Sequence, residues 1–145
     1  MVIQVKHPKR YDTTKATSKR MSHVHLKGGK TETMLAKALW QRGIRYRRNF
    51  KDLPGSPDIA ITKTKIAVFV DGEFWHGKDW LQRKKRLKRN REYWIEKIEE
   101  NIRRDKRDDK ELRDIGWQPL HFWEKDIIKN LDYCVELVLY YDKYR

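Results

Sequence analysis

The sequence predicts one α/β or α+β domain built on a mixed central sheet. A chain of 145 residues has the size of one ordinary domain. The apolar run at 66–70 is typical of a strand buried on both faces, and helical patterns stand both before and after the strand patterns. We therefore expect residues 30–145 to form one folded unit, with residues 1–29 as a basic arm.

The first elements follow directly from spacing and turn chemistry. Apolar residues at helical intervals predict a helix over 30–42, and Gly43 is a typical stop signal. Residues 46–50 can form a strand. The segment 53–57 contains two prolines and a glycine, which predicts a rigid turn. Residues 17–23, within the arm, could form one helical turn.

Strand and helix patterns alternate in the rest of the chain. Strands are expected over 58–62 and 66–70, and a very basic connection follows at 76–92. A long amphipathic helix should run from about 91 to 115. A strand over 118–123 and a terminal helix within 126–141 complete the order α-β-β-β-α-β-α.

The charge of the chain predicts a nucleic-acid partner. Its 35 Lys and Arg residues exceed its 21 Asp and Glu residues, for a formal net charge of +14. Lys and Arg that neutralise phosphates release counterions and thereby drive binding. An anionic membrane surface is the weaker alternative. Aromatic residues make up 12% of the chain, which argues against a disordered basic polymer.

Several locations and site types are disfavoured. No stretch approaches 18 apolar residues, and the first ten residues have no apolar core of a signal peptide. We therefore expect a cytoplasmic, nucleoid-associated protein. The single cysteine, Cys134, rules out an internal disulfide and a cysteine-rich zinc site. Metals with oxygen ligands remain open.

Acidic side chains and a histidine gather at the predicted strand ends. Asp58 follows Pro57 at the start of one strand, and the next strand runs into the segment 71–76, which contains Asp71, Glu73 and His76. Neighbouring strands would bring their oxygens together, where they could share Mg²⁺ while the histidine moves a proton. Asp after Pro, and Asp-Gly, are also common turn residues, but turn chemistry alone does not explain the whole cluster.

Two further acids have ordinary alternative roles. Glu32 lies in the first turn of the predicted helix, where a carboxylate is favoured by the helix dipole. Asp105 belongs to the charged run 103–109, most of which should be a solvated helix face with ion pairs between residues four apart.

Taken together, these motifs resemble the very short patch repair (Vsr) mismatch endonucleases, a branch of the PD-(D/E)xK nuclease-like superfamily. The similarity extends over about residues 12–125. It implies a restriction-endonuclease-like core. The matching segments are Thr17–Ser22, Thr31-Glu32, Leu53–Asp58, Phe74–His76, Tyr93–Ile98, Arg104-Asp105, Gly116-Trp117 and Trp123-Glu124.

The resemblance implies roles for the polar residues. Asp58 would bind the metal together with the main-chain carbonyl of Val70, and His76 would be the general base for the attacking water. Glu32 and Asp105 match acids that hold metal-bound waters. The resemblance therefore favours a role in the active site for both acids over the ordinary helix roles.

The resemblance also implies DNA contacts. Phe74, Trp75 and Trp94 match an aromatic wedge that enters the base stack beside a T·G mismatch, and Met21 matches an arm residue inserted from the other groove. Core packing is the alternative for any aromatic residue, and it suits Trp40, Trp117 and Trp123 better. Backbone phosphates would be contacted by the arm and by Arg83, Lys84, Lys85, Arg86, Lys88 and Arg89.

The chain departs from its relatives at a structural zinc site. The corresponding positions are Glu73, Lys78, Trp80 and Lys125, which cannot ligate zinc as a set. Structural zinc is therefore not expected, and its packing role would pass to Trp80 or to a Glu73–Lys125 ion pair. Asp71 stands where such relatives have another histidine, and its carboxylate could be a second Mg²⁺ ligand.

The resulting hypothesis is a Mg²⁺-dependent DNA endonuclease. It would nick one strand at or beside a T·G mismatch in double-stranded DNA, leaving a 5′-phosphate and a 3′-hydroxyl. We expect a monomer, with a mismatch-repair protein as a candidate partner. One alternative is a site-specific homing or restriction-like endonuclease. Another is a non-catalytic protein that binds distorted DNA.

Overall fold

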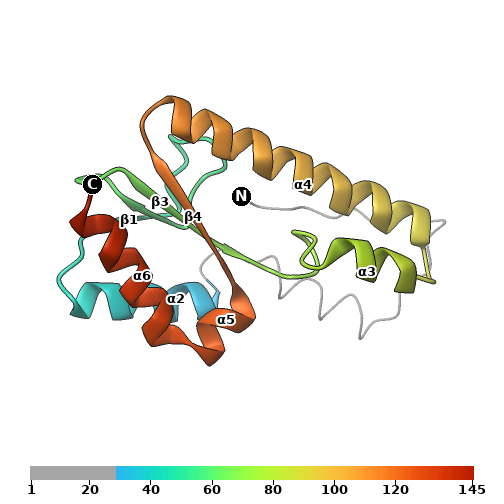
Figure 1. Ribbon diagram of the computed structural model, residues 1–145, viewed down its shortest axis with the longest axis horizontal. Coiled ribbons are helices and arrows are strands. Elements are labelled where there is room, and N and C mark those ends of the chain that lie inside the picture. Colours follow the sequence, from blue (N-terminus) through green and yellow to red (C-terminus); the bar gives the residue numbers. More distant parts are fainter. Residues whose placement is uncertain (1–28) are drawn as a thin grey trace.

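The predicted mixed sheet is present in the structure, a computed structural model that describes residues 29–145 (Figure 1). The predicted arm, with Met21 and the turn at 17–23, lies outside these residues except for Gly29. Neighbouring strands in the sheet are antiparallel except for the last pair, which is parallel. In sheet order, the strands are β1 (Arg47–Arg48), β2 (Ile59–Ile61), β3 (Ile66–Asp71) and β4 (Gln118–Trp123).

Helices cover both faces of this sheet (Figure 1). On one face, α2, α5 and α6 pack against one another and against the strands, and α4 crosses the other face. The short α3 lies beside the N-terminal half of α4, beyond the end of the sheet. The helices are α2 (Lys30–Gln41), α3 (Trp80–Arg86), α4 (Arg91–Asp114), α5 (Glu124–Lys129) and α6 (Leu131–Lys143). In residues 29–145, no helix is both long and apolar enough to cross a bilayer.

The structure corrects three of the predicted elements. The first strand is shorter than 46–50, because Asn49 adopts a left-handed conformation with φ of 50°. The basic connection contains the helix α3. The single terminal helix is two helices, because α5 starts directly after β4 and Asn130, with φ of −137° and ψ of 51°, interrupts it before α6.

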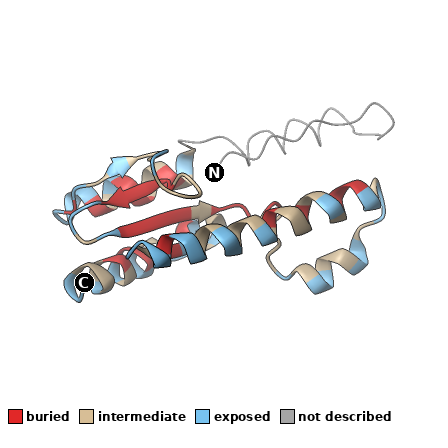
Figure 2. Ribbon diagram, turned by 90° about the horizontal axis from the view of Figure 1, so that it is seen from above, coloured by how far each residue is buried: buried red, intermediate tan, exposed pale blue. Residues whose placement is uncertain are grey.

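Alternation along β3 explains why this strand is buried on both faces. Val68 faces the core formed with α2, α5 and α6, to which Leu39 and Phe122 also belong. Ala67 and Phe69 face α4, where they pack with Leu112. Figure 2 shows the central strands buried, while α4 alternates between buried and exposed residues along its length. The strand therefore lies between two packed layers.

A second, aromatic core lies beyond the sheet. Trp75 and Trp94 pack edge to face with ring centroids 5.3 Å apart, and each is also edge to face with Phe74. Tyr93 and Ile98 of α4 complete the cluster. This core fastens the segment after β3 to the N-terminal half of α4, where the sheet offers no support.

The assignment of the other tryptophans to the core is wrong for one of them. Trp40 is 50% exposed, and the guanidinium of Arg45 lies 3.7 Å from its ring centroid. Trp117 is partly buried and packs against the cluster formed by Ala67, Phe69 and Leu112. Trp123 is likewise partly buried.

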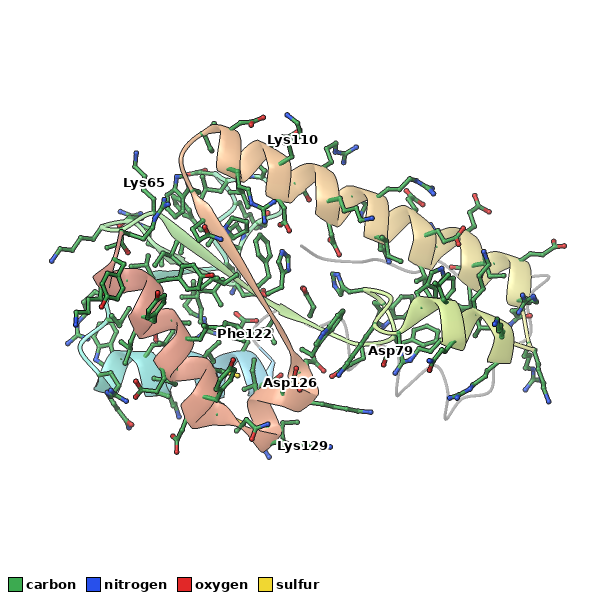
Figure 3. All side chains as sticks on the ribbon, in the orientation of Figure 1. Lys65, Asp79, Lys110, Phe122, Asp126 and Lys129 are labelled. Carbon is green, nitrogen blue, oxygen red and sulfur yellow. The ribbon has the colours of Figure 1, made fainter. Side chains whose placement is uncertain are left out.

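The outer side of α4 is a solvated, charged face, as the sequence predicts. Lys110 points away from the molecule in Figure 3 and pairs with Asp114 at 2.8 Å. Arg104 pairs with Glu100 at 3.1 Å across one helical turn. Such exposed pairs contribute little to stability, so α4 is held mainly by the residues of its inner side.

Gly77 should tolerate a side chain poorly. Its φ is +71°, and a Cβ atom there would lie 2.5 Å from Cδ1 of Ile102 and 3.3 Å from Cγ2 of Ile98. We expect Gly77→Ala to lower the free energy of unfolding by about 2–4 kcal/mol, since it adds overpacking to a left-handed backbone. Urea denaturation measures this change.

Gly43→Ala is the matched control. Gly43 also has a positive φ, +90°, but its Cβ would meet no atom within 4 Å. It should therefore show only the backbone cost, about 1–2 kcal/mol. Equal losses in the two variants would contradict the predicted clash with α4.

Candidate active site

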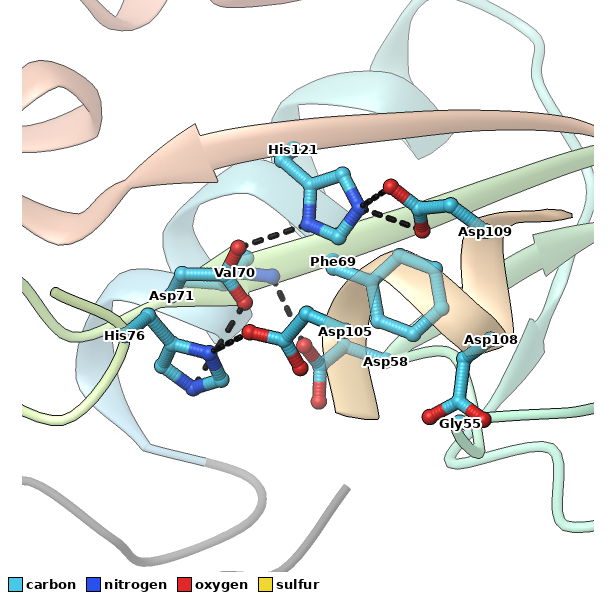
Figure 4. A pocket seen from close by; sticks show the side chains of 10 residues that line it. All are labelled: Gly55, Asp58, Phe69, Val70, Asp71, His76, Asp105, Asp108, Asp109 and His121. Carbon is cyan, nitrogen blue, oxygen red and sulfur yellow. Dashed lines mark hydrogen bonds and ion pairs between the residues drawn. The ribbon is translucent and has the colours of Figure 1, made fainter. Parts of the chain in front are cut away.

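A pocket between the end of β3 and α4 brings together most of the predicted polar residues (Figure 4). Its lining is strongly acidic despite the positive charge of the whole chain. Gly55, Phe69 and Val70 complete the wall. The titratable residues in the lining are Asp58, Asp71, His76, Asp105, Asp108, Asp109 and His121.

Asp58 lies immediately before β2. Its side chain is buried, and its Oδ2 accepts a hydrogen bond of 2.7 Å from the main-chain N–H of Val70. The rigid turn before it and the antiparallel pairing of β2 with β3 set this position. The expected proximity of Asp58 to the end of β3 is therefore present.

Glu32 lies outside the pocket lining. It is 4% exposed, and its Oε1 accepts hydrogen bonds from Nη2 and Nε of Arg48 on β1 at 3.0 and 3.3 Å. Arg48 pairs in register with Ile59, the neighbour of Asp58. The carboxylate of Glu32 is thus held near the edge of the site by an ion pair with Arg48, whose side chain is 32% exposed.

His76 and Asp105 form the closest polar contact of the pocket. Nδ1 of His76 lies 2.5 Å from Oδ2 of Asp105, which joins the segment after β3 to α4. Burial opposes a charged imidazole, but the hydrogen bond to Asp105 and the charge of Asp71 outweigh it and raise the pKa of His76 above 6.5. The charge of His121 acts in the opposite direction.

Asp71 contacts two histidines. Its Oδ2 lies 2.6 Å from Nδ1 of His121, and its Oδ1 lies 3.8 Å from Nε2 of His76. Burial alone would raise the pKa of Asp71, but the hydrogen bond from His121 and the charges of both imidazoles lower it. This carboxylate is therefore ionised at neutral pH.

Sequence reasoning missed three residues of the pocket: Asp108, Asp109 and His121. The two aspartates were assigned to a solvated run, yet they are only partly exposed and face the pocket from α4. Burial and the charge of Asp105 raise the pKa of Asp108. His121 stands opposite Phe69 in the parallel pairing, so a correct strand register would have placed it near Asp71.

The residues predicted to contact DNA fall into two groups. Trp75 and Trp94 are 1% and 6% exposed, and Phe74 is partly exposed at the edge of their cluster. Lys85, Arg86, Lys88 and Arg89 are exposed on α3 and the loop after it. Arg83 and Lys84 are partly buried, and Lys84 pairs with Glu99 of α4 at 2.9 Å.

The four positions related to a zinc site have other contacts. Glu73 is buried, and its Oε1 accepts a 2.8 Å hydrogen bond from the main-chain N–H of Lys125 at the start of α5. The contact therefore differs from the expected ion pair between side chains. Nζ of Lys78 lies 5.8 Å from the ring centroid of Trp123. Trp80 donates its indole N–H to Glu99 at 3.0 Å.

Hard oxygen atoms dominate the donor set of the pocket, which fits Mg²⁺. Within residues 29–145, no three His, Cys, Asp or Glu side chains are arranged to hold one metal ion. Mg²⁺ does not require such a cage, since it usually keeps several waters and binds through one or two carboxylates. Asp58, buried in the lining of the pocket, is one carboxylate of the kind that Mg²⁺ binds.

Comparison with known proteins identifies the chain as a nuclease. A family model described as "DNA mismatch endonuclease Vsr" matches residues 10–82. The type II nicking enzyme V.NmeDIP of Neisseria meningitidis serogroup C is 52% identical over 87% of this chain and 85% of its own length. The type II nicking enzyme V.HpaIIP of Haemophilus parainfluenzae is 51% identical over 72% and 74%.

A mismatch endonuclease is also among the relatives. The DNA mismatch endonuclease Vsr of Escherichia coli (strain K12) is 36% identical over 76% of this chain and 70% of its own length. The chain therefore belongs to the Vsr family of DNA mismatch endonucleases and is an endonuclease that nicks DNA.

Proposed function

We propose that this endonuclease uses Mg²⁺ to nick one strand at or beside a T·G mismatch. One observation supports this proposal above the others. Asp58, paired with the main chain of Val70, shares a pocket with the His76–Asp105 pair. Metal-dependent phosphodiester hydrolysis requires a hard-oxygen ligand and a proton acceptor in such proximity.

Asp58 and the main-chain carbonyl of Val70 would hold the ion. In a strand paired antiparallel, the N–H and C=O of one residue point to the same side. Since the N–H of Val70 bonds to Asp58, its carbonyl should lie on that side too. Bound there, Mg²⁺ would supply positive charge for the scissile phosphate. We leave Asp71 outside the ligand set, because its contacts are to His76 and His121.

His76 is the proposed general base. A carboxylate accepts hydrogen bonds, so Asp105 holds the imidazole with its hydrogen on Nδ1. Nε2 is then the basic nitrogen, and it removes a proton from the water that attacks phosphorus. The bond between phosphorus and the 3′-oxygen breaks, and this oxygen takes up a proton from water and leaves with the fragment on the 5′ side of the nick. That fragment therefore ends in a 3′-hydroxyl, and the fragment on the 3′ side begins with a 5′-phosphate. Asp105 and Glu32, the latter fixed by Arg48, would orient waters around the ion.

DNA would be held across the basic surface of α3 and its loop. The exposed cations Lys85, Arg86, Lys88 and Arg89 would contact backbone phosphates, with Arg83 and Lys84 behind them. Phe74 would lead the wedge, because it has an exposed edge while Trp75 and Trp94 support it from the aromatic core. Met21 of the arm would insert from the other groove.

The mismatch assignment is supported by the name of the Escherichia coli relative, a DNA mismatch endonuclease. A mismatched step also costs less to unstack than a paired one, which favours a wedge there. The protein would act as a monomer, because one site makes one nick. A mismatch-repair protein remains a candidate partner.

A nicking assay tests the proposal. One duplex of fixed sequence is labelled on each strand in turn and prepared with either a T·G or a C·G pair. We expect Mg²⁺-dependent nicking of one strand of the T·G duplex, at a rate at least tenfold above that of the paired duplex, and no nicking with EDTA. Equal cutting of both duplexes would contradict mismatch specificity and favour a site-specific nuclease. DNA binding without cleavage would contradict the catalytic assignment.

A further inference from the structure

His121 is the histidine of the pocket that the proposed mechanism does not use. It lies on β4 at the pocket rim, with 31% of its side chain exposed. Its ring stacks on Phe69, with centroids 4.7 Å apart and planes 11° apart. Because Phe69 and His121 are register partners in the parallel pairing, the sheet itself fixes the ring.

Both ring nitrogens of His121 face carboxylates. Nδ1 lies 2.6 Å from Oδ2 of Asp71 on β3, and Nε2 lies 2.7 and 2.8 Å from the two oxygens of Asp109 on α4. Ionised carboxylates only accept hydrogen bonds, so both nitrogens donate. Asp109 thus holds the ring of His121, and His121 holds one oxygen of Asp71.

The other oxygen of Asp71 faces the proposed general base. Oδ1 lies 3.8 Å from Nε2 of His76, the nitrogen left basic by the bond between Nδ1 and Asp105. This separation exceeds a direct hydrogen bond, and one water molecule can contact both atoms. Such a water would donate one hydrogen to Nε2 of His76 and the other to Oδ1 of Asp71, which leaves a lone pair for phosphorus.

We propose that His121 is a positioning residue for strand nicking: by holding Oδ2 of Asp71, it keeps Oδ1 where it orients the attacking water at His76. This inference rests on the proposed function, since it assigns the attacking water to His76. His121 acts through Asp71 and does not touch the reacting atoms. The contacts run from Asp109 through His121 and Asp71 to His76 (Figure 4).

A purely structural role must be separated from this one. His121 also ties α4 to the sheet, so its loss could loosen the fold and slow nicking indirectly. Leu112→Val is the matched control. Leu112 lies on α4 and is buried against Ala67 and Phe69 of β3. Its apolar side chain takes no part in the polar contacts from Asp109 to His76. The substitution weakens the same junction by removing a methylene group.

Single-turnover nicking of the T·G duplex with saturating enzyme is the first measurement. His121→Asn should lower the rate by about 10–100-fold, as loss of an outer partner of a site residue typically does, with the Kd for DNA changed less than about twofold. Asp71→Asn should cause a similar loss. The double variant should be about as slow as the slower single variant, because both substitutions break one chain of contacts. Leu112→Val should lower Tm and keep at least half of the wild-type rate.

Three kinetic outcomes would overturn the positioning role. They are an unchanged rate in His121→Asn, an equal loss in Leu112→Val at the same decrease in Tm, and multiplicative losses in the double variant. A wild-type protein that does not nick the T·G duplex would instead remove the proposed function, and the positioning role with it. If the wild type nicks the T·G duplex and His121→Asn nicks it at the same rate, the positioning role is wrong but the proposed function stands.

NMR of the DNA-free protein labelled with ¹⁵N-histidine provides a readout that does not depend on activity. At pH 7, both ring nitrogens of His121 should show the signals of N–H groups, and His121→Asn should shift the ring signals of His76. Leu112→Val should leave the His76 signals within a small fraction of that shift. A His121 ring with one bare nitrogen, or His76 signals that ignore the substitution, would overturn the inferred chain of contacts.

Discussion

Replacing Asp58 with Asn should nearly abolish nicking while the protein still binds DNA. The substitution keeps the shape of the side chain. It also keeps an oxygen that can accept the hydrogen bond from the N–H of Val70, which is 2.7 Å long in the wild type. However, it removes the negative charge proposed to bind Mg²⁺. Metal-ion stabilisation is typically worth several kcal/mol, so we expect the single-turnover rate to fall by about 10³-fold. Fluorescence anisotropy with labelled duplex should give a Kd near that of the wild type, since Asp58 contacts no phosphate in the proposed complex.

Asp52→Asn is the matched control for this prediction. Asp52 lies close to Asp58 in the chain but is exposed and outside the pocket lining. Its substitution makes the same change in net charge, and the nicking rate should stay within about twofold of wild type. An Asp58→Asn variant that nicks within tenfold of wild type would show that the ion, if one is used, is held elsewhere.

The pocket residues that come from neighbouring segments of the sequence could be placed close together from the sequence alone. Asp58 follows a turn stiffened by prolines, and Asp71 and His76 follow a strand whose apolar run predicts burial. Neighbouring strands join these two segments, so their proximity needs only the hairpin between β2 and β3. The mixed sheet and the long helix follow from patterns of the same local kind.

The contribution of α4 could be predicted only in part, because it depends on which side of the helix faces the sheet. Trp94, Ile98, Asp105, Asp109 and Leu112 fall on one side at helical spacing, so the apolar stripe continues into acids. Within the charged run, that side is difficult to recognise, since Arg and Lys surround each Asp. Packing against β3 turns these aspartates inward and leaves the neighbouring cations exposed.

The aromatic residues show where tertiary context outweighs composition. Trp40 has the character of a core residue, but α2 ends at Gln41 and leaves the indole at the surface beneath Arg45. Trp75 and Trp94 are instead buried, because the extended half of α4 has no sheet beneath it and needs an apolar partner of its own. No sequence pattern distinguishes these two environments, since both place a tryptophan among charged residues.

Replacing His76 with Ala should greatly lower the rate of nicking and abolish its dependence on pH. General-base catalysis typically contributes about 10²–10⁴-fold, and we expect a loss in that range in single-turnover nicking. In the wild type, Asp105 and Asp71 raise the pKa of His76 above 6.5. A base must be unprotonated to act, so the rate should be low below that pKa and rise as pH increases through it.

Asp105→Asn keeps an acceptor for Nδ1 of His76 but removes the charge, so the pKa of His76 should decrease and the rise in rate should move to lower pH. If His76→Ala retained the wild-type rise, or if Asp105→Asn moved it to higher pH, another group would be the base and the contact between His76 and Asp105 would serve only to hold α4 against the end of β3.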